Sequence, residues 1–201
     1  MKEIELLVKQ IKPFFEDDEM EGYRFSPYIK QLIELLENSK PSKERVDNYL
    51  LIGDAYKKMG RFSLAASYHE KALDDIIVLK VSKGLDELFY SVLRERNFYV
   101  DDDCKDVLDQ VKESGLLDER LLKETYENVM NNRRSLRHDP VEMSEEYLAV
   151  IDEVEEKIAK NRTFKGMGSC HEIWSLKWQY LLEKGINWKS PSMLNPRVMF
   201  D

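Results

Sequence analysis

The sequence contains few of the residues that build covalent or metal chemistry, and few that end helices. It has 2 cysteines, 3 histidines, 8 glycines and 6 prolines among 201 residues. Two cysteines cannot form a disulfide framework, and a cytoplasmic compartment would keep them reduced. With charged residues at 35% and apolar residues at 42%, the composition favours amphipathic helices whose outer faces are solvated.

The sequence also lacks the signals of membrane insertion and export. It has no run of about 18 apolar residues, which a membrane-spanning helix requires. Its first five residues, Met1-Lys2-Glu3-Ile4-Glu5, include acidic side chains where a signal peptide has a basic start and an apolar stretch. We therefore expect a soluble, cytoplasmic protein without a membrane partner. The formal net charge of −8 disfavours a nucleic acid as partner, because its backbone is anionic.

No residue pattern indicates a metal or a cofactor. His69, His138 and His171 lie far apart, and none has the spacing of a zinc-binding pair. The acidic residues between 142 and 156 have no histidine partner and are typical of a solvated helix face. Asp101-Asp102-Asp103 lacks the glycine and the final glutamate of a calcium loop. We expect neither a metal site nor a bound cofactor.

Apolar residues recur at intervals of three and four through most of the chain, which predicts an all-α protein without strands. The expected helices cover residues 4–15, 26–36, 42–59, 62–81, 85–96, 103–113, 119–130, 140–160 and 169–184. The loop 161–168 contains two glycines and two basic residues, and the chain changes character after it. We therefore expect a helical domain over residues 1–160, followed at 161–201 by a helix and a docked, irregular tail.

Two capping signals occur near this expected boundary. Asp139-Pro140-Val141-Glu142 combines a helix N-cap, a proline at the first helical position and a reciprocal glutamate. It predicts one long helix from Pro140 to about Lys160. Ser169 and Glu172 have the spacing of a second capping box, in which the hydroxyl and the carboxylate each bind a free backbone N–H group.

Segment 49–73 has small and large residues at the places where two antiparallel helices need them. Gly53 and Ala65 lack the bulk that would hold the helices apart, and Gly60 lies where the first helix must end. The pattern resembles one tetratricopeptide (TPR) repeat of about 34 residues. The residues that carry this resemblance are Tyr49, Ile52, Gly53, Tyr56, Gly60, Phe62, Ala65 and Ala72. His69 departs from it, because the repeat usually has an aromatic residue there.

The resemblance implies antiparallel helical hairpins stacked as a short solenoid, and a groove that binds a protein or a peptide. Tyr49, Asp54 and Tyr56 are then the expected binding residues on the first helix. Repeats that clamp a chaperone's carboxylate have a lysine and an asparagine where this chain has Leu50 and Asp54. A groove of this kind should therefore prefer apolar or basic ligands.

A basic turn interrupts the acidic sequence at residues 131–138. Its arginines, Arg133, Arg134 and Arg137, suit forked contacts with an acidic peptide or a phosphate. The same charges would also neutralise the C-terminus of the helix expected over residues 119–130. Both interpretations remain open.

The end of the chain carries large apolar residues that are costly to leave in water. Its main residues are Cys170, His171, Trp174, Trp178 and Trp188. The block resembles the endings of some uncharacterised bacterial proteins, which implies a bacterial source. We expect the tail to dock on its own body or on a sister chain, which would make a homodimer.

Cys170 is the one candidate for covalent chemistry. The first turn of a helix stabilises a thiolate, but the adjacent His171 points about 100° away and is badly placed to act as its base. A small buried cysteine is the alternative interpretation. The leading hypothesis is thus a TPR-like interaction module. A thiol-dependent enzyme or redox sensor at Cys170 is the alternative, and a structural subunit of a larger assembly is a third possibility.

Overall fold

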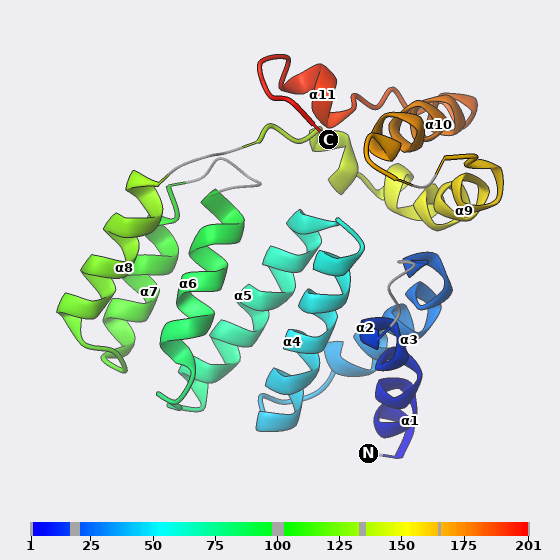
Figure 1. Cartoon of the computed structure of the whole chain (residues 1–201). Coiled ribbons are helices and arrows are strands. Elements are labelled where there is room, and N and C mark those ends of the chain that lie inside the picture. Colours follow the sequence, from blue (N-terminus) through cyan, green and yellow to red (C-terminus); the bar gives the residue numbers. More distant parts are fainter. Residues whose placement is uncertain (1, 17–20, 98–102, 133–135, 165, 201) are drawn as a thin grey trace.

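The computed structural model describes residues 2–16, 21–97, 103–132, 136–164 and 166–200. Within these ranges every regular element is a helix, as the periodicity predicted (Figure 1). The elements are α1 (Lys2–Ile11), α2 (Pro13–Glu16), the short 3-10 helix η1 (Gly22–Arg24), α3 (Ser26–Glu37), α4 (Lys43–Lys58), α5 (Phe62–Val78), α6 (Leu85–Glu95), α7 (Lys105–Ser114), α8 (Glu119–Asn131), η3 (Pro140–Met143), α9 (Glu145–Asn161), α10 (Ser169–Glu183) and α11 (Pro191–Leu194).

Helices α4 and α5 form the antiparallel hairpin that the TPR-like segment predicted. The Ser42 hydroxyl accepts a hydrogen bond from the N–H group of Arg45 and so caps α4. Gly60 follows α4 with a positive φ of 73°, which glycine adopts at little cost. Ala65 and Ala72 are fully buried at the contact. Helices α4 to α8 lie in one row in Figure 1.

His69 explains why Gly53 is needed in this hairpin. A Cβ atom at position 53 would lie less than 3.0 Å from two ring atoms of His69. The His69 Nδ1 atom lies 2.7 Å from Glu95 of α6, whose carboxylate also accepts a bond of 2.8 Å from Lys57. A buried polar contact thus joins α5 to the next helix at the position where the TPR repeat has an aromatic residue.

The hydrophobic side chains form two clusters. The first extends from α1 to α8, and Val129 is its last buried member. The second runs from Tyr147 to Trp188 and joins α9, α10 and the start of the tail. Along the sequence the two clusters are separated between Val129 and Tyr147, and the predicted domain boundary after residue 160 remains a prediction. We call residues 2–132 the N-terminal body and residues 136–200 the C-terminal unit.

The end of α5 and the start of α9 differ from those predicted. Helix α5 ends at Val78 instead of residue 81, because Lys80 takes a positive φ of 56°. Asp139 caps only the short η3. The Ser144 hydroxyl accepts a hydrogen bond from the N–H group of Tyr147 and so caps α9, which is a separate helix. The predicted long helix from Pro140 is therefore wrong at its start.

The predicted capping box at Ser169 is also absent. Gly168, with a φ of 83°, occupies the N-cap of α10. The Glu172 carboxylate instead accepts hydrogen bonds from the preceding loop: from the Thr163 N–H at 2.9 Å, the Thr163 hydroxyl at 2.8 Å and the Phe164 N–H at 2.9 Å. The glutamate fixes the loop between α9 and α10 and does not close a capping box.

Among the described helices, none combines the length and the apolar character that crossing a bilayer requires.

Candidate functional site

A cleft of about 750 Å³ lies between the N-terminal body and the C-terminal unit. One side is formed by η1 and the turn between α4 and α5, and the other by α9 and α10. Residues of η3, the segment before it and the tail close the ends. We refer to this space as the inter-unit cleft. Its volume falls in the range of ordinary ligand sites, roughly 300–1,000 Å³.

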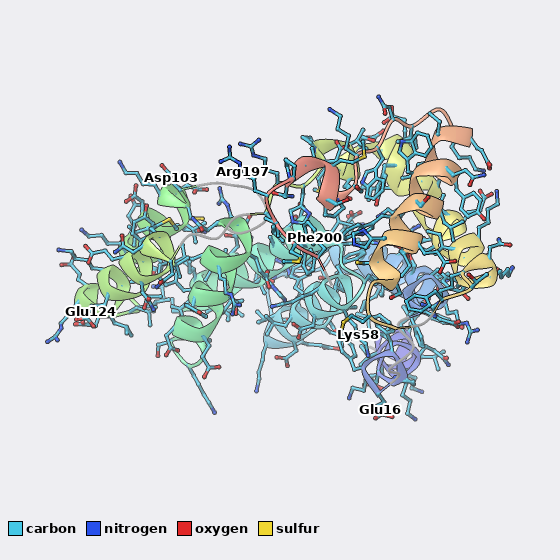
Figure 2. The ribbon with its side chains drawn as sticks, turned by 45° about the horizontal axis from the view of Figure 1, so that its top comes forward. Glu16, Lys58, Asp103, Glu124, Arg197 and Phe200 are labelled. Atoms are coloured by element: carbon cyan, nitrogen blue, oxygen red, sulfur yellow. The ribbon has the colours of Figure 1, made fainter. Side chains whose placement is uncertain are left out.

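Aromatic side chains form much of the cleft wall. Trp188 lines the cleft, and its side chain is almost fully buried, at 1% exposed. Trp174 meets the ring of Phe200 edge to face, with 5.1 Å between the ring centroids and an interplanar angle of 88°. The His171 ring contacts Trp174 from another side at 5.5 Å. In Figure 2, Phe200 lies at the end of the tail, between the C-terminal helices and the row of helices.

The tail is docked on its own chain, one of the two arrangements expected. The Asn195 side chain accepts a hydrogen bond from the Arg137 N–H at 2.8 Å and donates one to the Arg137 carbonyl at 2.9 Å. The indole N–H of Trp188 donates to Glu142 at 2.7 Å, and the Lys189 N–H donates to Asp139 at the same distance. The tail therefore binds the segment 137–142, which shares the cleft with it.

Lys177 lines the cleft from the middle of α10. Its Nζ atom lies over the rings of Trp188 and Tyr147, 4.8 Å and 5.3 Å from their centroids. The nearest carboxylate oxygen, in Glu142, lies 3.9 Å away and already accepts the Trp188 bond. Burial lowers the pKa of Lys177, although Glu142 and Glu155 act in the opposite direction. The side chain is 18% exposed.

Arg162 also lines the cleft, directly after α9. Its Nε atom is buried and finds no hydrogen-bond acceptor among the described residues. The acidic side chains of the cleft have donors of their own. Glu155 is 2.8 Å from Arg61, and Glu21 is paired with Arg24. The cleft thus combines an apolar wall with two cationic groups that have unused donor capacity.

A group of ion pairs holds the two units together beside the cleft. The Arg61 side chain is 7% exposed and reaches Asp152 at 2.6 Å and Glu155 at 2.8 Å. Lys30 and the Ser26 hydroxyl each donate to the other oxygen of Asp152 at 2.7 Å. Burial would lower the pKa of Arg61, but the two carboxylates outweigh it and raise that pKa.

The residues predicted to line a TPR-like groove lie away from the cleft. Tyr49 and Tyr56 are 7% and 5% exposed and pack against Tyr68. Asp54 is exposed, and its carboxylate lies 3.6 Å from the Nε2 atom of His69. Phe62 and Gly60 of the repeat-like segment do line the cleft. The binding role assigned to the tyrosines and Asp54 remains a prediction.

The basic turn is described only in part. Arg133 and Arg134 lie outside the described residues, so their predicted role remains a prediction. Arg137 binds Asn195 through its backbone. Leu136 and His138 line the cleft, which places the described end of this turn at the site. Burial lowers the pKa of His138.

Cys170 lies in the first turn of α10, as predicted, and is half-buried. The Nε2 atom of the neighbouring His171 lies 3.3 Å from the carbonyl oxygen of Phe200. Trp178 is 41% exposed and lies outside the cleft. Among the described residues, no group of three histidine, cysteine, aspartate or glutamate side chains is placed to hold a metal. A thiol-based activity at Cys170 remains a prediction.

Sequence reasoning did not identify Lys177 as a site residue. It lies three residues after Trp174 and four before Leu181, and so belongs to the same apolar face of α10. A charged residue inside an apolar helical face was the available signal. The sequence predicted a capping role for Glu142. Its hydrogen bond to Trp188 joins residues 46 positions apart, so no local sequence pattern indicates it.

Comparisons with protein families, with curated proteins and with solved structures found no match.

Proposed function

We propose that this protein is a helical interaction module whose inter-unit cleft binds a segment of another polypeptide. The observation that carries the proposal is the position of Phe200. This residue of the chain's own tail already packs on Trp174 at the cleft. A polypeptide segment with a large apolar side chain therefore has the chemistry that this surface accepts.

The composition and the repeat-like hairpin support the same class of function. TPR-like hairpins present surfaces for polypeptides. We place this activity in the bacterial cytoplasm. A sister chain can also supply the tail, since an exchange of identical elements uses the same contacts in a homodimer.

Selection of peptides from a random library, displayed on phage, tests the proposal. Ala159 lines the cleft on α9, so Ala159→Trp should block it. Ala149 is exposed on the same helix and does not line the cleft, so Ala149→Trp is the matched control. We expect peptides selected by the wild-type chain to bind the Ala149→Trp variant and to lose binding to Ala159→Trp. Equal binding to both variants would contradict the proposal.

The tail should compete with such a peptide. Replacing Phe200 by alanine removes the edge-to-face contact with Trp174, a type of contact that contributes about 0.5–1.5 kcal/mol. Peptide affinity measured by calorimetry should then rise about two- to tenfold. An unchanged affinity would mean that the peptide does not use this part of the cleft.

A further inference from the structure

The cleft has an excess of unused hydrogen-bond donors. Lys177 and Arg162 line it, and the carboxylates that share it already accept bonds or ion pairs from the chain. The buried Nε atom of Arg162 has no acceptor among the described residues. A buried donor without an acceptor costs free energy, which an acceptor on a ligand would recover.

The two cations come from different parts of the cleft wall. Arg162 follows α9 in the loop that leads into the start of α10, and Lys177 comes eight residues after Ser169. The aromatic wall formed by Trp174 and Phe200 lines the same cleft.

We propose that the inter-unit cleft selects acidic segments, in which aspartate or glutamate side chains flank a large apolar one. The acidic groups bind Arg162 and Lys177, and the apolar group packs on Trp174 in place of Phe200. This inference rests on the proposed function and specifies its ligand. It replaces the expectation of a basic ligand, because that expectation came from Asp54, which lies outside the cleft.

The phage-displayed library also provides the test. Peptides selected by the wild-type chain should be enriched in aspartate and glutamate. When one of them is resynthesised with glutamine for glutamate, its affinity for the wild-type chain should fall about tenfold, because a hydrogen bond between charged groups is lost. The double variant Arg162→Met/Lys177→Met should bind the two peptides equally. A tenfold preference retained by the double variant would overturn the inference.

Three further variants separate charge from folding. Lys184→Met removes a cation that does not line the cleft. The Nζ atom of Lys184 donates a hydrogen bond of 2.7 Å to Glu153 on α9. This variant should keep the full preference for glutamate. The variants Arg162→Lys and Lys177→Arg retain the positive charges, so they should keep most of the preference for glutamate. Loss of the preference in Lys184→Met would show that the effect is not local to the cleft and would overturn the inference.

Two dyes test the charge selection without any peptide. The probes are anilinonaphthalene sulfonate, which is anionic, and Nile red, which is neutral. The double variant should bind the anionic dye about tenfold more weakly and the neutral dye equally well. An equal effect on both dyes, or none on either, would overturn the inference. If the library yields no peptide, the proposed function fails, and the two dyes still decide the charge selection.

Discussion

The ring of His69 lies in the space that a side chain at position 53 would need. His69 is 3% exposed, and Glu95, 2.7 Å away, is 2% exposed. A buried pair of this kind is stable only if each partner is satisfied, and Lys57 supplies the second bond of Glu95. The absence of a side chain at Gly53 thus makes room for a polar contact between three helices.

Replacing Gly53 by alanine should destabilise the protein. Alanine favours a helix over glycine by about 1 kcal/mol, but its Cβ atom would lie less than 3.0 Å from the His69 ring. Overpacking of a core costs about 1–3 kcal/mol, so the clash should outweigh the gain. Urea denaturation measures the difference. Gly166→Ala is the control, because a Cβ atom at position 166 would lie 3.4 Å from its nearest neighbour, an atom of the Phe164 ring. The stability of this variant should stay near that of the wild type.

The stability should fall as the pH rises from about 6.5 to 9. Burial alone would lower the pKa of His69, but the nearby carboxylates of Asp54 and Glu95 outweigh it and raise the pKa to about 9. Because the folded pKa lies above the unfolded one, the stabilisation is complete below pH 6.5 and is lost as the pH passes 9. The loss should be roughly 2–4 kcal/mol.

Urea denaturation at a series of pH values, on the wild type and on His69→Gln, tests this linkage. Glutamine keeps a hydrogen bond to Glu95 but does not titrate in this range. The variant should therefore show a much flatter profile. Parallel profiles for the two proteins would show that another group causes the pH dependence.

At the scale of the elements, the sequence could predict the helices but not all of their ends. Periodic apolar residues predicted the long helices, and in the structure Ser42 and Asp118 cap α4 and α8. Ser169 fails as a cap because Glu172 binds Thr163, nine residues earlier, instead of the start of its own helix. A local pattern cannot predict which of two competing partners lies closer in the folded chain.

The two serines make this difference measurable. Ser144→Ala removes the cap of α9 and should cost about 1 kcal/mol in the free energy of unfolding. Ser169→Ala should change it by less than about 0.5 kcal/mol, because Gly168 occupies that cap. Thermal or urea denaturation of the two variants compares them. A cost at Ser169 as large as that at Ser144 would contradict the assignment of the caps.

The candidate site was only partly predictable for the same reason. The cost of exposing Trp188 and Phe200 predicted a docked tail, and the tail is docked. The cleft itself depends on how α9 and α10 face the turn between α4 and α5. That turn lies about 100 residues before these two helices in the sequence. Such long-range packing leaves no periodic signal. The local sequence therefore does not indicate that Arg162 lines a cleft, and for Lys177 it shows only a charge on the apolar face of α10.

At the scale of the molecule, one arginine connects the two units. Arg61 comes from the turn between α4 and α5, and both of its carboxylate partners, Asp152 and Glu155, come from α9. The three tryptophans, Trp174, Trp178 and Trp188, all belong to the C-terminal unit. Tryptophan fluorescence therefore reports on that unit, whereas circular dichroism reports on the helices of both.

Replacing Arg61 by methionine should uncouple the units. Loss of the buried cation removes the Arg61 partner of Glu155 and leaves Asp152 with Lys30 and Ser26 alone, at a cost of about 2–4 kcal/mol because both carboxylates are partly solvated. The fluorescence transition in urea should move to lower urea than the circular dichroism transition. Lys30→Met, at a side chain 49% exposed, should cost less than about 1 kcal/mol. Equal shifts for the two variants would contradict the central role of Arg61.

Hydrogen–deuterium exchange of the full chain, with and without a library-selected peptide, tests the central claim most directly. If the inter-unit cleft is the binding site, the peptide should slow exchange on both of its walls, at residues 158–162 and 173–177. The segment 197–200 should exchange faster, because the peptide displaces Phe200 from Trp174. Protection confined to the exposed face of α4 around Asp54, with the cleft walls unchanged, would contradict the account.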